Sequence, residues 1–312
     1  REEIDDGDGG VVTVDWAHPD QSVELVINCP TVILFPGLAG HSDKDYIRSL
    51  AKCITTGLRW RVCAVNWRGF NCALKSPKVF SPNDISDMEL IMNHAVKKYP
   101  ECKLYAVGFS AGSNQLVKYL GKRQNPHKIV AAISVCNGFE YASHLERLEK
   151  TPLGQAFYSR GLAYIHQEYL RQYGKELEQV EGFDLNKALG ATSHSELDEA
   201  LVEPLYGFSD MKDYYKDCES RPYIPDVETP LLCLQAADDP LFTEGDSVCR
   251  DVLPVVELHD NKNCIYFETE FGSHLNFVEA TIRNGIEREN YTFCDRVVQE
   301  YFRHVSSLYE DS

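Results

Sequence analysis

The pentapeptide Gly-Phe-Ser-Ala-Gly at residues 108–112 constrains the fold of this chain more than any other short segment. It follows the apolar run at 104–107 and precedes a helix-like stretch at 113–121. A Ser between small residues at a strand-to-helix junction is typical of a nucleophile elbow, a strained turn that lifts the hydroxyl clear of the sheet. Because the turn is so sharp, a Cβ at either glycine would collide with the neighbouring strand and helix. We therefore expect Ser110 to be a nucleophile at the end of a parallel strand.

Two later segments supply the partners that a nucleophilic Ser requires. Residues 230–237 are typical of a buried strand, which runs directly into Asp238 and Asp239. Residues 264–269 are typical of another strand, and the short Gly-containing loop after it carries His274. Since the order Ser, acid, His is that of triads built at the ends of parallel strands, we expect these groups to meet at one edge of the sheet.

Each partner has a less specific alternative. The two acids before Pro240 could form a solvated turn. Between them we expect Asp239 to be the triad member, because the acid immediately before the Pro lies deeper in the loop. The chain has 10 His residues, and a lone His is more often structural than catalytic. Four of them lie in helix-like or acidic segments and are expected to be surface or packing residues: His94, His144, His166 and His304.

An oxyanion hole should complete the site with two backbone N–H donors. The first is expected from Ala111, which directly follows the nucleophile. The second is expected from Leu38, which follows Gly37 in the loop after the hydrophobic strand at 31–35. The alternative for this segment is an ordinary strand-to-loop turn.

Motifs along nearly the whole chain resemble the AB hydrolase 4 family, which includes YheT-like bacterial hydrolases, plant embryogenesis-associated proteins and animal abhydrolase-domain lipases. The matching segments are Pro36-Gly-Leu-Ala-Gly40, Asn66-Trp-Arg-Gly69, Tyr99-Pro100, Ala106-Val-Gly-Phe-Ser-Ala-Gly-Ser-Asn114, Lys118-Tyr-Leu-Gly121, Tyr214-Tyr215, Ala237-Asp-Asp-Pro240 and Gly272-Ser-His-Leu275. The resemblance implies an esterase or lipase that acts on acylglycerols, phospholipids or small esters. The chain departs from the family pattern at His41, Ala111 and Asn276, which leaves the shape of the acyl pocket and the substrate preference open.

Composition narrows the possible partners. The formal charge of −17 argues against nucleic acids and anionic membrane surfaces, since their phosphates would be repelled. The 11 Cys residues are scattered without metal-ligand spacing, which favours reduced thiols in a reducing, cytoplasmic-type compartment. No metal or organic cofactor is implied. No run reaches the roughly 18 apolar residues of a membrane helix. Similar proteins often carry an N-terminal anchor, so we expect membrane association only through a segment outside this chain.

The patterns predict strands at 11–16, 23–27, 31–35, 61–66, 103–109 and 129–135, and helices at 46–57, 81–98 and 110–121. Strands and helices alternate from residue 31 onward, which predicts an α/β-hydrolase fold with a mostly parallel central sheet and helices on both faces. We expect residues 1–137 and 230–312 to form this core. The regular alternation stops between them, so residues 138–229 are expected to form a helical cap or lid. The insertion is rich in aromatic residues, which suit either an apolar acyl pocket or simple packing of the insertion onto the sheet: Phe157, Tyr158, Tyr164, Tyr169, Tyr173, Phe183, Tyr206, Phe208, Tyr214 and Tyr215.

These patterns together predict a serine carboxylic-ester hydrolase with Ser110, His274 and Asp239 as its triad. Two alternatives stay open at this stage. One is an acyltransferase with the same triad, and the other is a non-catalytic binding protein on the same fold. Acyl length, head group and oligomeric state are not determined by the sequence.

Overall fold

The computed structural model describes residues 1–20, 28–125, 127–150, 154–241, 243–244, 247–248, 253–277, 280–282, 286–288 and 291–310. Its centre is an eight-stranded sheet. Across the sheet the strands are β1 (Glu2–Asp5), β2 (Val11–Ala17), β4 (Arg61–Asn66), β3 (Thr31–Phe35), β5 (Leu104–Phe109), β6 (Ile129–Val135), β7 (Leu231–Ala236) and β10 (Cys264–Thr269). The strands from β4 to β10 pair in parallel, whereas β2 is antiparallel to β4 and β1 is antiparallel to β2. The expected mostly parallel sheet is confirmed.

The central strands are buried on both faces. Every residue of β3, β4 and β5 is buried, which agrees with their nearly continuous apolar sequences. In the pairing of β3 with β5, Phe35 lies opposite Gly108. This register brings the loop after β3 to the same edge of the sheet as the Ser110 turn.

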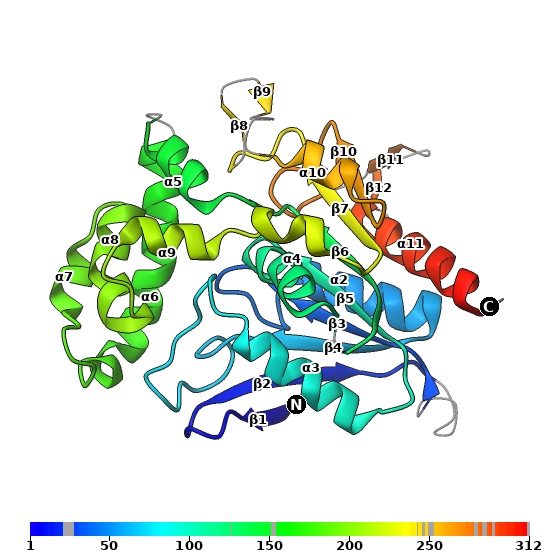
Figure 1. Cartoon of the computed structure of the whole chain (residues 1–312), viewed down its shortest axis with the longest axis horizontal. Helices are drawn as coiled ribbons and strands as arrows, with labels where there is room; N and C mark the ends of the chain where they lie inside the picture. The colour runs from blue at the N-terminus through cyan, green and yellow to red at the C-terminus, as the bar shows by residue number, and fades with distance from the viewer. Residues whose placement is uncertain are drawn as a thin grey trace.

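Helices cover both faces of the sheet (Figure 1). The core on one face includes residues of α3 (Ser86–Lys98), α4 (Ala111–Arg123), the short helix η4 (Arg221–Asp226) and α10 (Val255–Asp260). The core on the other face includes residues of α2 (Asp45–Cys53), its π-helical continuation η1 (Ile54–Leu58) and α11 (Phe293–Glu310). The sheet therefore lies between two separate apolar cores.

A run of helices separates β6 from β7. Its members are α5 (Tyr141–Lys150), η2 (Gly154–Ser159), α6 (Arg160–Leu177), α7 (Leu185–Gly190), α8 (His194–Leu201), η3 (Val202–Tyr206) and α9 (Met211–Cys218). Figure 1 shows α5 to α9 gathered beside one end of the sheet. They bury an apolar cluster of their own, in which Leu170 of α6 and Leu197 of α8 take part.

The N-terminal half differs from the sequence expectations in two places, and a third expectation lies outside the described residues. The strand β1, which the patterns did not predict, occupies the edge of the sheet beside β2. A strand expected at 23–27 lies outside the described residues. A helix expected from Ser81 begins at Ser86, because the backbone carbonyls of Ser81 and Asp84 accept hydrogen bonds from the side-chain amide of Gln115 at 2.9 and 2.7 Å.

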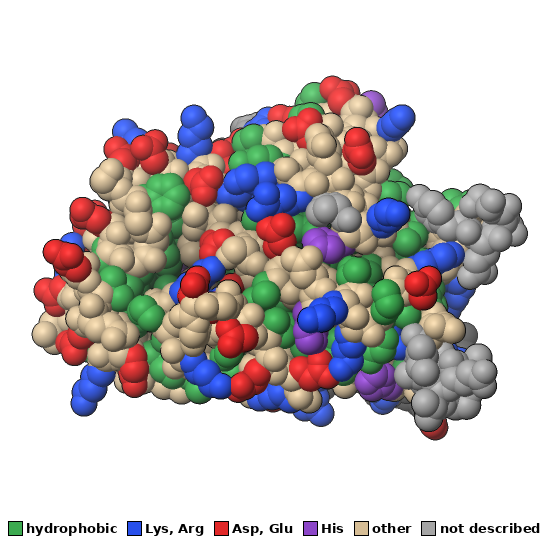
Figure 2. Space-filling model, turned by 60° about the horizontal axis from the view of Figure 1, so that its bottom comes forward, with side chains coloured by type: hydrophobic (Ala, Val, Ile, Leu, Met, Phe, Trp, Pro, Cys, Tyr) green, Lys and Arg blue, Asp and Glu red, His purple; other side chains and the backbone are tan. Residues whose placement is uncertain are grey.

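Two hairpins complete the described elements: β8 (Thr243–Glu244) with β9 (Ser247–Val248), and β11 (Ala280–Ile282) with β12 (Ile286–Arg288). Within the described ranges, each helix is either too short or too polar to cross a bilayer. On the face drawn in Figure 2, acidic side chains are interspersed with Lys and Arg rather than separated from them.

Candidate active site

Ser110 lies in a strained turn between β5 and α4. Its backbone has φ 51° and ψ −120°, a combination that a residue with a side chain rarely adopts. A Cβ added at Gly108 would lie 2.5 Å from the Cα of Ser113, and one added at Gly112 would lie 2.5 Å from the carbonyl oxygen of Phe35. The steric argument for two glycines in this turn is therefore confirmed.

The loop after β10 brings His274 to Ser110. The imidazole Nε2 lies 2.9 Å from the Ser110 Oγ, and Nδ1 lies 2.7 Å from the Oδ2 of Asp239. Asp239 is only 1% exposed, so its carboxylate is shielded from water. Because a carboxylate can only accept, Nδ1 carries the proton, which leaves Nε2 as the acceptor for the Ser hydroxyl. Three side chains from distant parts of the sequence thus form one hydrogen-bonded line.

Asp238 has a different position from its neighbour. It is exposed, and its Oδ1 accepts hydrogen bonds from the backbone N–H groups of Gly272 and Ser273 at 2.8 and 2.6 Å. These bonds fix the turn that carries His274. The two adjacent acids therefore act on the same loop, one through the imidazole and one through the backbone.

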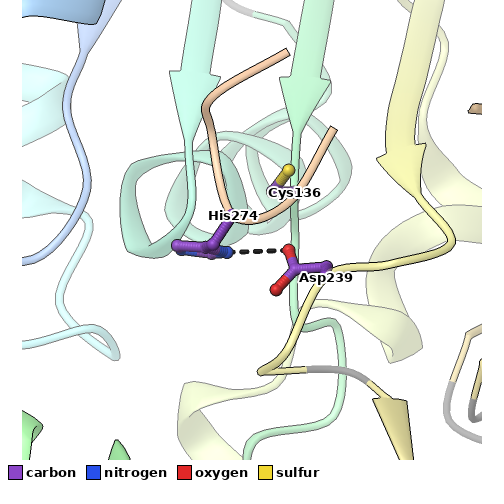
Figure 3. A group of neighbouring side chains, drawn as sticks. All are labelled: Cys136, Asp239 and His274. Carbon is purple, nitrogen blue, oxygen red and sulfur yellow. Dashed lines mark hydrogen bonds and ion pairs between the residues drawn. The ribbon is translucent and has the colours of Figure 1, made fainter. Parts of the chain in front are cut away.

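Cys136 lies beside the His–Asp pair, at the end of β6 (Figure 3). One potential ligand atom from each of Cys136, Asp239 and His274 falls within 4.8 Å of the others, a spacing that a metal ion could bridge. Burial and the nearby Asp239 carboxylate raise the pKa of the Cys136 thiol well above its ordinary value. Since metals bind the thiolate, and since Nδ1 already pairs with Asp239, this chemistry favours the hydrogen-bonded pair over a metal centre.

The loop after β3 lies directly against Ser110. A Cβ added at Gly37 would approach the Ser110 Cβ to 3.0 Å. Trp67 Nε1 donates to the carbonyl of Pro36 at 2.9 Å, and this bond fixes the start of the loop. Leu38 from this loop and Ala111 from the first turn of α4 both line the cavity in which Ser110 lies. The first N–H groups of a helix have no partner within the helix, so the Ala111 amide is available to an anion.

The empty space at Ser110 amounts to about 600 Å³, which includes the open solvent at its mouth. The structure gives its lining as Leu38, Ser110, Ala111, Asn114, Gly138, Tyr141, His144, Leu145, Leu162, His194 and Leu241. The sequence patterns do not indicate most of these lining residues. They predict a surface or packing role for His144 and do not distinguish His194. No local pattern marks either residue, since their position depends on how the helices between β6 and β7 pack.

The aromatic residues of the insertion mainly pack its own core. Tyr169, Tyr173 and Phe183 are buried in its apolar cluster, whereas Phe157 and Tyr164 are exposed. Two of the group, Tyr169 and Tyr206, line a second, smaller cavity that shares Leu38 with the first. None of the ten aromatics named from the sequence is among the described residues that line the cavity at Ser110.

Comparison with known proteins agrees with this geometry. The family model described as the alpha/beta hydrolase fold matches residues 30–250. The embryogenesis-associated protein EMB8 of Picea glauca is 31% identical over 87% of this chain, and the monoacylglycerol lipase of Saccharomyces cerevisiae is 31% identical over 79%. This chain spans 59% and 54% of those two proteins. Human phospholipase ABHD3 is 28% identical over 96% of this chain and 71% of its own length.

Solved structures share the fold. The esterase Est1E of Butyrivibrio proteoclasticus, with ferulic acid bound, superposes with a TM-score of 0.57 over 100% of this chain and 98% of its own, at 14% identity. The resemblance to the AB hydrolase 4 family and the α/β-hydrolase fold are both confirmed.

Proposed function

This chain belongs to the alpha/beta hydrolase fold family, and on that premise we propose that it is a serine carboxylic-ester hydrolase. One observation carries the proposal: the unbroken line of hydrogen bonds from Ser110 through His274 to Asp239, at 2.9 and 2.7 Å. The names of two relatives, a monoacylglycerol lipase and a phospholipase, support an ester as the substrate.

The proposed reaction proceeds through an acyl-enzyme. Ser110 Oγ attacks the ester carbonyl while His274 Nε2 accepts its proton. Asp239 orients the imidazole and stabilises its charged form. The backbone N–H groups of Leu38 and Ala111 donate to the oxyanion, and the proton then passes from His274 to the departing alcohol. Water, activated by His274 in the same way, hydrolyses the acyl-enzyme and releases the acid.

We further propose that residues 138–229 act as a cap over this site. Leu145 of α5, Leu162 of α6 and His194 of α8 all contribute to the cavity wall, which supports a role for the insertion in excluding water. The mainly apolar lining suits an uncharged acyl or alcohol portion. A reducing compartment is also proposed, and it is supported by the ten described cysteines, none of which forms a disulfide with another of them.

Two measurements test the proposed activity. A fluorophosphonate probe should label the protein at Ser110 and should not label the folded Ser110→Ala variant. Hydrolysis of p-nitrophenyl esters from acetate to palmitate should be lost in the same variant and should reveal the preferred acyl length. An unlabelled, folded wild-type protein would instead support a binding role, and faster product formation with an added alcohol than with water would indicate an acyltransferase.

A further inference from the structure

One ionisable residue in the wall of the cavity at Ser110, His194, pairs with a carboxylate that lies behind the lining. Most of the cavity lining is apolar, and two of its polar side chains are engaged with the backbone. The Asn114 side-chain amide donates to the carbonyl of Cys218 at 2.5 Å, and the His144 Nε2 contacts the carbonyl of Gly138. His194 differs from both, because its ring is paired with a carboxylate inside the insertion.

His194 is the first residue of α8 and is only 4% exposed. Its Nδ1 lies 3.1 Å from the Oδ2 of Asp198, one turn further along the helix, in an ion pair rather than a well-directed hydrogen bond. Asp198 is 3% exposed and also accepts a hydrogen bond from the Tyr215 hydroxyl at 3.0 Å. The opposite ring nitrogen, Nε2, has no hydrogen-bond partner among the residues that the structure describes.

The charges around this ring favour Nε2 as a donor. Burial lowers the pKa of His194, but the Asp198 carboxylate and, more weakly, Glu149 raise it above the ordinary value. The neighbouring His166 ring, whose centre is 5.4 Å away, has a pKa lowered to about 4 by burial and by His194, so it stays neutral at pH 7. An imidazole whose charged form is favoured by Asp198 thus lies in an apolar wall, with Nε2 left to form a hydrogen bond.

Burying such a group is costly unless a partner satisfies it. Among the described residues, Asp198 faces only Nδ1, through the ion pair, and no group bonds Nε2. The remaining hydrogen bond must come from water or from a molecule in the cavity, and that cavity also holds the Ser110 hydroxyl.

We propose that His194 and Asp198 form a binding site for a neutral hydroxyl group of the ester substrate, an inference that rests on the proposed hydrolase function. No Lys or Arg is among the described residues that line this cavity, and the nearby Asp198 carboxylate is negative. An anionic group such as a phosphate would therefore be disfavoured here. A hydroxyl group, which can donate to or accept from Nε2 without introducing charge, fits this wall.

The hydroxyl could belong to the alcohol portion or to the acyl chain, and matched esters separate these sources. Glyceryl octanoate against methyl octanoate tests the alcohol portion. Methyl 8-hydroxyoctanoate against methyl octanoate tests the acyl chain. For each pair, the ratio of kcat/KM values would be measured for wild type, for His194→Leu and for the control His259→Leu, whose imidazole is exposed on α10.

We expect His194→Leu to lower at least one of the two ratios by about 10- to 100-fold, mainly through KM, because it removes a buried hydrogen-bond partner of the hydroxyl. The pair of esters that responds identifies the source of the hydroxyl. His259→Leu should leave both ratios unchanged. If both ratios stay at the wild-type value in His194→Leu, or if all three esters lose activity equally, the hydroxyl site is refuted. If wild type hydrolyses none of the esters, the hydrolase proposal itself fails.

A second experiment uses only the wild-type protein, so its outcome does not depend on whether a variant folds. The non-hydrolysable 1-O-octylglycerol should inhibit hydrolysis of a p-nitrophenyl ester at least 10-fold more strongly than octyl methyl ether if the hydroxyl belongs to the alcohol, and 8-methoxyoctan-1-ol should do so if it belongs to the chain. Equal inhibition by all three ethers would overturn the proposal.

Discussion

At the scale of single residues, Gly108 and Gly112 cannot accommodate a side chain, because backbone atoms occupy the space that a Cβ would need. Backbone atoms cannot rotate away as a side chain can. We expect Gly112→Ala to lower the free energy of unfolding by about 2 kcal/mol or more, because its Cβ would overlap the end of β3. Gly161→Ala in α6 is the matched control, since a Cβ there meets nothing within 4 Å and Ala favours helix. Urea denaturation of both variants measures the difference, and equal stability would contradict the steric argument.

The two adjacent acids should differ sharply on substitution. Asp239→Asn should lower kcat by about 10³- to 10⁴-fold, because an amide no longer stabilises the imidazolium or its tautomer. Asp238→Asn should cost about 10-fold or less, since the amide oxygen can still accept from the Gly272 and Ser273 N–H groups. Steady-state kinetics on one p-nitrophenyl ester compares them. A larger loss in Asp238→Asn would show that the roles are reversed.

At the scale of elements, α6 carries a half-buried histidine that cannot easily be protonated. Burial and the adjacent His194 lower the pKa of His166 to about 4, although the Asp198 carboxylate acts in the opposite direction. In the unfolded chain the pKa of a His is near 6.5. The unfolded state therefore binds this proton between pH 6.5 and 4 and the folded state does not. Consequently, the free energy of unfolding falls as the pH falls through that window, by about 3 kcal/mol at its acid end.

Replacing this ring should remove that part of the pH dependence. We expect the stability of His166→Leu, measured by urea denaturation from pH 8 to 4, to fall less steeply below pH 6.5 than that of wild type. The exposed His259→Leu should keep the wild-type slope. Parallel curves for wild type and His166→Leu would show that His166 is not the titrating group.

At the scale of the whole molecule, Lys118 joins the insertion to the core. Lys118 belongs to α4 and its side chain is fully buried. Nζ donates to the backbone carbonyl of Asn83 at 2.9 Å and to that of Asp217 in α9, and it forms an ion pair with the Asp217 carboxylate at 3.3 Å. Lys118→Met should lower the free energy of unfolding by about 1–3 kcal/mol, since the two backbone carbonyls lose their buried donor. Lys122→Met, on the exposed side of the same helix, should be nearly neutral.

The same substitution should also affect catalysis if the insertion forms part of the site. We expect a higher KM for p-nitrophenyl esters in Lys118→Met, because α9 anchors helices that supply part of the cavity wall. Thermal unfolding and KM would be measured together on each variant. An unstable variant with an unchanged KM would show that the position of the insertion does not depend on this bond.

Local sequence patterns determined much of the sheet and its catalytic edge. Strands β4, β6 and β10 have the boundaries that their apolar runs predicted. Parallel strands place the residues that follow them at one edge of a sheet, so Ser110, Asp239 and His274 could be expected to meet before any coordinate was known. Choosing Asp239 over Asp238 rested only on the adjacent Pro240, and the hydrogen bonds of the fold distinguish the two.

Only the tertiary structure decided what faces the Ser110 hydroxyl. His194, His144 and Leu162 belong to helices whose sequences show an apolar stripe but not which neighbour that stripe will pack against. Their place in the cavity wall results from long-range packing, to which no local periodicity is sensitive. The sequence determined the residues at the carboxyl edge of the sheet, because hydrogen-bonded strand pairing fixes the register. The residues on the opposite side of the cavity depend on the packing of side chains between helices, which is decided only when the whole chain has folded.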